Sequence, residues 1–228
     1  VKALAITDHD TVAGYLEALK VLRPEGPRLV SGVEFSCRWS GVTVHIVGLG
    51  MDCEHRAMCE GLALLDDARR ERGEKIARRL EKCGYPGALP GALAAAGSSQ
   101  LGRPHFAQWM VKQGHVRDHN EAFDRYLGQG KTGDVKTFWP ELADVVRWIE
   151  DAGGVSVLAH PYKYRLTGMK LRRLLVDFIA AAGRALEVQS GRQTPEQSVQ
   201  LLRYAAEFDL EISAGSDYHR DAPYAPPV

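Results

Sequence analysis

The sequence lacks the features that mark several classes of protein. It has no excess of either charge, since Lys plus Arg and Asp plus Glu both number 29, so no overall field favours nucleic acid or a membrane surface. No apolar run approaches the roughly 20 residues of a membrane-spanning helix, and no cleavable leader pattern opens the chain. These absences predict a soluble, cytoplasmic protein with no membrane partner and no evident obligate protein partner. Four cysteines show no Cys-x-x-Cys spacing, which favours inert thiols in a reducing compartment: Cys37, Cys53, Cys59 and Cys83.

Short apolar segments alternate with helical patterns along much of the chain. With 228 residues, the sequence can form one large domain or a domain with an insertion. Near-continuous Val, Ile and Leu suit strands buried on both faces, as in parallel sheets and barrels. This alternation predicts an α/β fold. The strand candidates are 2–7, 28–36, 43–50, 154–161, 184–190 and 210–216, and the helix candidates between them include 11–22, 140–154 and 194–208.

Two of these helices carry clear start signals. Thr11 is a plausible N-cap for the helix over 11–22. Thr194, followed by Pro195 at the first helical position and Gln197, has the pattern of a capping box. These signals predict where the chain passes from strand or loop into helix.

Acidic residues and histidines stand at or just after the ends of the strand candidates. Carboxyl ends of parallel strands meet at one face, so these side chains are expected to converge there. A set that mixes His with Asp and Glu suits divalent transition metals such as Zn, Mn or Fe. A lone histidine such as His45, inside its strand, is commonly a hydrogen-bonded core residue, and Asp10 could cap the next helix. Similar placement in six strands nevertheless favours a metal site: Asp8, His9, Glu34, His160, Glu187 or Gln189, Asp217 and His219.

Several motifs together resemble one family. The segments LAITDHDTVAGYLEA, VSGVEFS, VHIVGLG, GVSVLAHPYKY and AGSDYH occur in order over nearly the whole chain. They closely resemble the PHP (polymerase and histidinol phosphatase) family of metal-dependent phosphoesterases, and within it the branch of 3',5'-nucleotide bisphosphate phosphatases and 5'-to-3' exoribonucleases. The resemblance implies a distorted (β/α)7 barrel that holds two or three divalent metal ions, most often Mn, with Zn or Fe as alternatives.

The resemblance also implies roles for individual residues. Glu34 matches the carboxylate that bridges two metals, and Asp217 matches both a metal ligand and a proton acceptor for the attacking water, so these two are the catalytic candidates. Asp8 is not one of the usual ligands. In addition, Pro161 after His160 is expected to hold that residue in an extended conformation that aims its imidazole. The matched histidines are His45 and His160 for one metal, and His9 and His219 for another.

The family's pattern begins with a D-x-H-x-H-S strand that does not occur in this sequence. That strand would precede Val1, and the family's barrel continues through a further strand and helix after the GSDYH motif. We therefore expect an N-terminal strand and a C-terminal end of the barrel outside the given sequence. Without the HxH pair, one metal would keep only Asp217 and Glu34 as ligands.

The middle of the chain has a different character. Over 56–139 the strand patterns stop, long amphipathic helix patterns take over, and 14 Lys and Arg face 10 Asp and Glu. This predicts a helical insertion, 56–139, that caps a barrel formed by 1–55 and 140–228. Its basic run RRERGEKIARRLEK fits a solvated helix face with i,i+4 ion pairs. In GRPH, Arg103 and His105 stand at a helix start, where backbone N–H groups favour anions, and this motif resembles the family's phosphate-contacting segment.

Two further candidates for substrate binding are Lys131, in GQGKTG, and Tyr162. Tyr162 and Tyr164 after the AHP motif could stack on a nucleobase or pack against the cap. The predicted activity is hydrolysis of a phosphate monoester of a nucleotide 3',5'-bisphosphate, with 5'-to-3' trimming of short RNA, so the partner would be a nucleotide or short oligonucleotide. The alternatives are a histidinol-phosphate-type phosphatase and, if the HxH strand is absent, a non-catalytic nucleotide-binding module. A polymerase editing domain is disfavoured.

Overall fold

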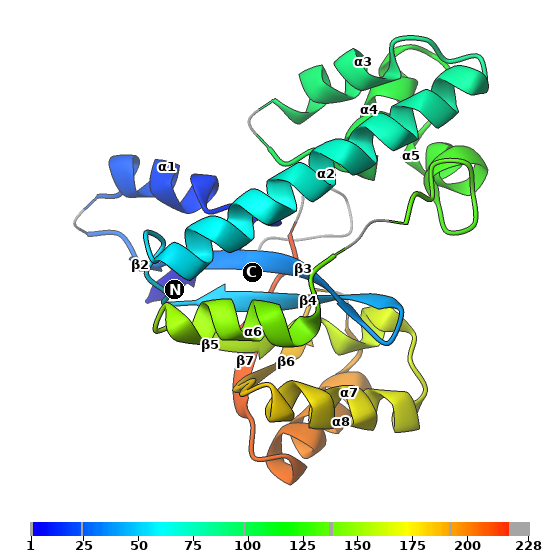
Figure 1. Ribbon diagram of the computed structural model, residues 1–228. Coiled ribbons are helices and arrows are strands. Elements are labelled where there is room, and N and C mark those ends of the chain that lie inside the picture. Colours follow the sequence, from blue (N-terminus) through cyan, green and yellow to red (C-terminus); the bar gives the residue numbers. More distant parts are fainter. Residues whose placement is uncertain (1, 24, 98, 137–138, 192, 219–228) are drawn as a thin grey trace. The chain divides into compact units, whose positions relative to one another are not determined.

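The computed structural model describes residues 2–23, 25–97, 99–136, 139–191 and 193–218, and the chain divides into two compact units (Figure 1). The first, an α/β unit, comprises Val1–Leu62 and Trp139–Val228. The second, a helical unit, is Ala63–Phe138, which falls within the insertion expected over 56–139.

The strands of the α/β unit form two sheets. A two-stranded parallel sheet joins β1 (Ala3–Ala5) to β2 (Arg28–Val30). A five-stranded sheet has the order β3-β4-β5-β6-β7, which is also the order along the chain. Its strands are β3 (Gly32–Trp39), β4 (Val42–Leu49), β5 (Val155–Leu158), β6 (Ala185–Ser190) and β7 (Glu211–Gly215).

The expected α/β class is confirmed, but a closed parallel barrel is not what the described residues form. β4 is antiparallel to both β3 and β5, whereas β5, β6 and β7 are parallel. The reason is local: Ser40 and Gly41, both with positive φ, join β3 to β4 by a two-residue turn, and a tight turn can only join antiparallel strands. Among the described strands, β3 and β7 are the outermost strands of the larger sheet.

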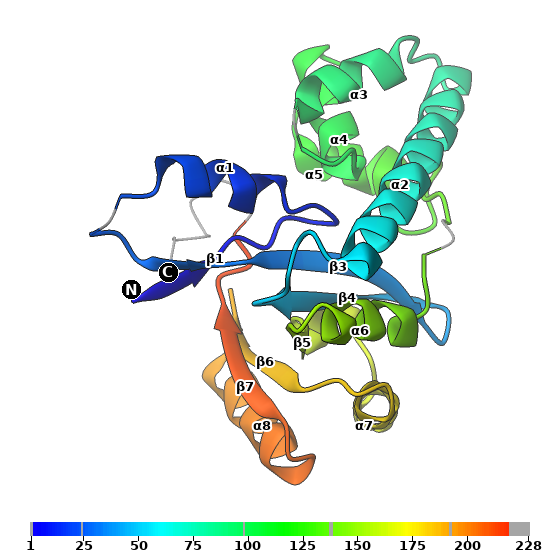
Figure 2. The same cartoon turned by 60° about the vertical axis from the view of Figure 1, so that its left-hand side comes forward.

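Helices cover the sheet because their apolar faces match it. Helix α6 (Leu142–Asp151) lies along β3, β4 and β5 in both views (Figures 1 and 2) and buries Val145, Val146 and Ile149. A Cβ on Gly48 of β4 would lie 3.1 Å from Ile149, so the glycine permits this close approach. The other helical elements of the unit are α1 (Ala13–Val21), the 3₁₀ turn η2 (Pro161–Tyr164), α7 (Gly168–Ala180) and α8 (Pro195–Glu207).

The helix-start signals give two different outcomes. The capping box is confirmed: Gln197 N–H donates to Thr194 Oγ1 at 3.3 Å, and Thr194 N–H donates to Gln197 Oε1 at 3.0 Å. The N-cap predicted at Thr11 is wrong, since α1 begins at Ala13 with Val12 as its N-cap. Thr11 Oγ1 instead accepts the Ala13 N–H at 3.1 Å.

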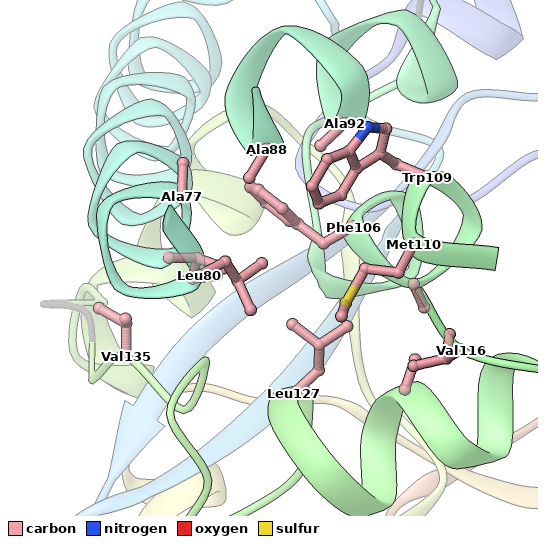
Figure 3. Packing of buried hydrophobic residues seen from close by; sticks show 13 residues of the cluster. Ala77, Leu80, Ala88, Ala92, Phe106, Trp109, Met110, Val116, Leu127 and Val135 are labelled. Atoms are coloured by element: carbon pink, nitrogen blue, oxygen red, sulfur yellow. The ribbon is translucent and has the colours of Figure 1, made fainter. Parts of the chain in front are cut away.

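The helical unit packs around its own apolar core (Figure 3). Leu80 of α2 (Arg56–Lys82), Phe106 and Met110 of α4 (Arg103–Lys112), and Leu127 of the π-helical turn η1 (Phe123–Leu127) are fully buried. Small residues on α3 (Ala88–Ala96) let α4 approach closely, because a Cβ on Gly91 would lie 2.0 Å from the Trp109 ring. A short α5 (His119–Ala122) completes the unit. No helix within the described ranges has both the length and the apolar character needed to cross a membrane.

Candidate metal centre

Strand register brings Glu34 of β3 and His45 of β4 to one face of the sheet. In the antiparallel pair, Glu34 stands opposite Val47 and Ser36 opposite His45, which makes Glu34 and His45 diagonal neighbours. Glu34 Oε1 lies 2.8 Å from His45 Nδ1.

His160 joins this pair from the next strand. It follows β5, and the Ala159 N–H donates to the His45 carbonyl at 3.1 Å, which extends the β4–β5 pairing up to His160. His160 Nε2 lies 2.7 Å from Glu34 Oε1 and 3.2 Å from His45 Nδ1. Three potential ligand atoms, from β3, β4 and the residue pair after β5, therefore converge at one point.

His9 approaches Glu34 from the other side. The segment after β1 makes an isolated parallel bridge with β3, in which Glu34 N–H donates to Asp8 O at 3.1 Å and Asp10 N–H donates to Glu34 O at 3.0 Å. His9 Nδ1 lies 3.6 Å from Glu34 Oε2, and the His9 and His45 rings are 4.8 Å apart. One potential metal-binding group is therefore His9, Glu34 and His45.

Asp217, just past β7, belongs to a second group with Glu34 and His160, whose ligand atoms lie within 4.8 Å of one another. Glu34 is shared by both groups, as a bridging carboxylate would be. The Lys163 ammonium forms an ion pair with Asp217. His219, expected as a ligand, lies outside the described residues.

The surroundings of Glu34 keep it ionised. Burial alone raises the pKa of this carboxyl, but hydrogen bonds from His160 and His45, together with the charges of His45 and His9, bring the pKa well below its usual value. Glu34 is only 7% exposed, so an anionic acceptor is held inside the protein.

The donor set fits divalent transition metals. Imidazole nitrogens and carboxylate oxygens are the ligands such ions prefer. Two nitrogens bound to one tetrahedral ion at about 2.0–2.1 Å would be ~3.3 Å apart, close to the 3.2 Å between His45 Nδ1 and His160 Nε2. Two imidazole nitrogens and one carboxylate oxygen therefore lie at spacings that a single shared cation would fit, once the protons between them are lost.

The backbone of His160 differs from the expected extended conformation. It has φ 28° and ψ 60°, in the left-handed region, although Pro161 follows. The expectation is wrong because Pro161 opens the turn η2, in which the Lys163 N–H donates back to His160 O at 2.9 Å. The turn requires a left-handed backbone at His160, whereas the proline that follows would by itself favour an extended backbone there.

Glu187 and Gln189 were alternatives from sequence, and the structure distinguishes them. Glu187 is buried, and its Oε2 accepts the His160 N–H at 2.6 Å. Gln189 is exposed and accepts a hydrogen bond from Ser198 Oγ at 2.8 Å. Burial raises the pKa of Glu187, while the His160 N–H opposes that rise. The period of two along a strand would place both residues on one face, so sequence could not separate them.

Asp10 and Asp8 lie next to the candidate ligands. Asp10 is 1% exposed, and its Oδ1 accepts the Ser36 N–H of β3 at 2.6 Å, which ties the His9 segment to the sheet. The Asp8 carboxylate lies against Gly14, where a Cβ would be 2.1 Å from Oδ2. The sequence offers Asp10 as a helix cap, but Val12 is the N-cap of α1.

A cavity of about 260 Å³ opens beside His160. Tyr162, a candidate either for stacking on a nucleobase or for packing against the cap, lines it. Tyr164 serves a different purpose, because its hydroxyl donates to Ala159 O at 2.7 Å and accepts the His45 N–H at 2.9 Å. The other lining residues are Lys163, Ser190, Gln193 and Gln197.

The remaining substrate candidates lie in the helical unit, where Arg103 and His105 are close to other basic residues. Arg103, at the first turn of α4, donates to Leu127 O at 3.0 Å and lies 3.9 Å from Asp134. His105 Nδ1 accepts the Gly102 N–H at 3.0 Å, and burial together with Arg69 lowers the His105 pKa. Lys131 is exposed.

Arg72 is one of these basic residues. Burial, helped by the charges of Arg103 and Arg69, lowers the pKa of Arg72 to about 10. The like charges around Arg72 would favour a bound anion beside it. The sequence pattern predicts a solvated helix face for Arg69 and Arg72, but Arg69 is buried.

The chain is similar to characterised and solved proteins over most of its length, although no family model matches it. It is 42% identical over 219 residues to a 5'-3' exoribonuclease of Haemophilus influenzae, covering 96% of this chain and 80% of the relative. It is 38% identical over 217 residues to a 3',5'-nucleoside bisphosphate phosphatase of Chromobacterium violaceum, covering 95% and 76%.

A solved amidohydrolase of Chromobacterium violaceum, with bound sulfate and no metal, matches with a TM-score of 0.89 and 36% identity over 99% of this chain and 84% of that one. A Bifidobacterium adolescentis protein, described as a metal-dependent phosphoesterase, matches with a TM-score of 0.85 and 30% identity over 100% and 79%.

Proposed function

Because this chain belongs to the PHP-type metal-dependent phosphoesterases, we propose that it hydrolyses a phosphate monoester of nucleoside 3',5'-bisphosphates and trims short RNA from the 5' end. The observation that carries the proposal is the meeting of Glu34, His45 and His160 within 3.2 Å. Relatives near 40% identity bear both activities in their names, and those names favour nucleotides over the histidinol phosphate that sequence left open.

Glu34 would hold two ions together, with His45 and His160 completing one pocket and His9 contributing to another. Divalent ions, which we expect to be Mn, would lower the pKa of a bound water and neutralise the charge of the phosphoryl group. Glu34 is suited to this role because both of its oxygens face imidazoles, Oε1 at 2.7 and 2.8 Å and Oε2 at 3.6 Å.

Asp217 would accept the proton of the attacking water and pass it to the leaving oxygen. It lies within reach of Glu34 and His160, and it forms an ion pair with the Lys163 ammonium. Lys163 also lines the cavity at His160, where its charge would attract a phosphate.

Each unit holds its own candidates for substrate recognition. The cavity next to His160 presents the Tyr162 ring, which could stack on a nucleobase. In the helical unit, Arg103, His105 and more weakly Lys131 would bind a phosphate, supported by the neighbouring charge of Arg72.

The test is a substrate panel with metal-loaded protein. Adenosine 3',5'-bisphosphate and a 5'-phosphorylated tetraribonucleotide should be hydrolysed far faster than histidinol phosphate or p-nitrophenyl phosphate. Glu34→Gln serves as the inactive control. Equal rates on all four substrates, or histidinol phosphate as the best, would overturn the nucleotide assignment. Phosphate release that persists unchanged in Glu34→Gln would overturn the metal centre.

A further inference from the structure

The peptide group between Ala159 and His160 is hydrogen-bonded at both ends by side chains. Its carbonyl, on Ala159, accepts the Tyr164 O–H at 2.7 Å, and its N–H, on His160, donates to Glu187 Oε2 at 2.6 Å. The two side chains come from different elements, η2 and β6. The plane of this peptide group is therefore fixed from two directions.

This matters because the His160 conformation is one that an isolated chain avoids. At φ 28° and ψ 60° an L residue crowds its own backbone, and the Pro161 ring adds a further restriction. Such geometry persists only where surrounding contacts over-determine it. Without them, relaxation of φ would swing the imidazole away from Glu34.

The position of Glu187 is itself closely defined. A Cβ on Gly215 of β7 would lie 2.4 Å from Glu187 Oε1, so the absence of a side chain at Gly215 makes room for the carboxylate. Glu187 is 8% exposed and contacts the chain at two places near candidate ligands: the His160 N–H, and Gly215, which lies two residues before Asp217. Within the described residues, neither group of potential metal ligands includes Glu187.

We propose that Glu187 and Tyr164 are positioning residues of the metal centre. They orient the Ala159–His160 peptide group and through it aim His160 Nε2 at Glu34 and His45. Tyr164 also accepts the His45 N–H at 2.9 Å, so it couples the backbones of two candidate ligands. The inference rests on the metal centre of the proposed function. It concerns two residues that belong to neither group of potential metal ligands.

The hydrogen bond, rather than the charge, is the feature that the proposal requires of Glu187. Glu187→Gln keeps a carbonyl oxygen for the His160 N–H, whereas Glu187→Ala removes the acceptor. Mn²⁺ affinity is measured by equilibrium dialysis with elemental analysis, and thermal unfolding of the metal-free proteins is followed in parallel. Glu187→Ala and Tyr164→Phe should bind Mn²⁺ about 10- to 100-fold more weakly, and Glu187→Gln should stay within about threefold of the unmodified protein.

A matched control separates positioning from simple stability. Glu150 is another carboxylate that supports β5, accepting a hydrogen bond from Ser156 Oγ at 2.9 Å, but near the opposite end of the strand from His160. Glu150→Ala should lower the unfolding temperature of the metal-free protein and leave the Mn²⁺ affinity unchanged.

The remaining outcomes each decide the matter. If Glu187→Ala lowers only stability, as Glu150→Ala should, the positioning role is refuted. If Glu187→Gln loses as much affinity as Glu187→Ala, the charge of Glu187 matters and not its hydrogen bond, which also refutes it. Glu34→Gln is measured alongside: a loss of metal there, with no loss in Glu187→Ala, leaves the metal centre standing and rejects the positioning role alone.

Discussion

The α/β unit and the helical unit depend on contacts of very different range. The candidate metal centre draws His9, Glu34, His45, His160 and Asp217 from across the chain, and contacts between residues distant in sequence, strand pairing above all, bring them together. The helical unit forms its core within Ala63–Phe138. Many of its ion pairs join residues four apart on one helix, such as Lys75 with Glu71.

This difference predicts different sensitivities. A site held by long-range register should fail when a single polar atom is changed, because no neighbouring group can replace it. A locally packed helical core should instead respond to lost volume, and its exposed i,i+4 pairs should contribute little. Variants in each unit can test this contrast.

Glu34→Gln is expected to have the largest effect. The change removes the charge shared by both groups of candidate ligands, so phosphatase activity should fall by at least about 100- to 1,000-fold, and bound metal should fall with it. Steady-state kinetics and elemental analysis provide the measurements. Glu141→Gln is the matched control. Glu141 forms an ion pair with Arg38, which lies on the same strand as Glu34, and the Glu141 side chain is 51% exposed. Comparable losses in both variants would show that Glu34 has no special role.

Leu80→Ala should be next in size, and it should affect stability alone. Leu80 is fully buried in the helical core, so its truncation should cost about 2–5 kcal/mol of unfolding free energy. Denaturant unfolding measures this loss, and Mn²⁺ affinity at low denaturant should stay unchanged. Leu93→Ala, at 49% exposure on α3, is the control and should cost far less. A parallel fall in metal affinity would contradict the independence of the two units.

Arg103→Ala should weaken substrate binding selectively. Loss of a charge-assisted phosphate contact of about 1.5–3 kcal/mol implies roughly 10- to 150-fold weaker binding. KM for adenosine 3',5'-bisphosphate should rise by that factor, with little change for p-nitrophenyl phosphate.

The control for Arg103 is Arg79→Ala. Arg79 makes the same kind of contact within the helical unit, donating to Thr132 O at 3.1 Å. Equal KM changes for the two substrates in Arg103→Ala, or the same selectivity in Arg79→Ala, would remove Arg103 from phosphate recognition.

Sequence could predict the chemistry of the centre better than its geometry. His and carboxylates after apolar segments indicated which side chains would meet, and the structure does bring His9, Glu34, His45, His160 and Asp217 together. Their individual roles stay predictions. Hydrophobic runs carry no direction, however, so the antiparallel setting of β4 had to come from the Ser40–Gly41 turn.

The conformation of His160 shows a second limit. A residue before proline prefers an extended backbone, yet His160 is left-handed. Its N–H is hydrogen-bonded to Glu187, 27 residues away in sequence, and a contact of that range cannot be read from the local pattern. Likewise, strand periodicity could not choose between Glu187 and Gln189. A start signal such as the Thr194 capping box succeeded because donors and acceptors there lie within three residues of one another.

The smallest expected effect tests that local signal. Thr194→Ala removes the acceptor for the Gln197 N–H at the start of α8, and an N-cap of this kind contributes about 1 kcal/mol. For a chain of this size, that loss should lower the unfolding temperature by about 2–4 °C. Thr194→Ser keeps the hydroxyl and should restore most of the loss, which isolates the cap from the lost methyl group. Because the cap lies on a helix outside the groups of candidate ligands, Mn²⁺ affinity should be the same in all three proteins. A measurable change in affinity would show that even local signals in the α/β unit reach the metal centre, and the contrast between the two units would then be one of degree.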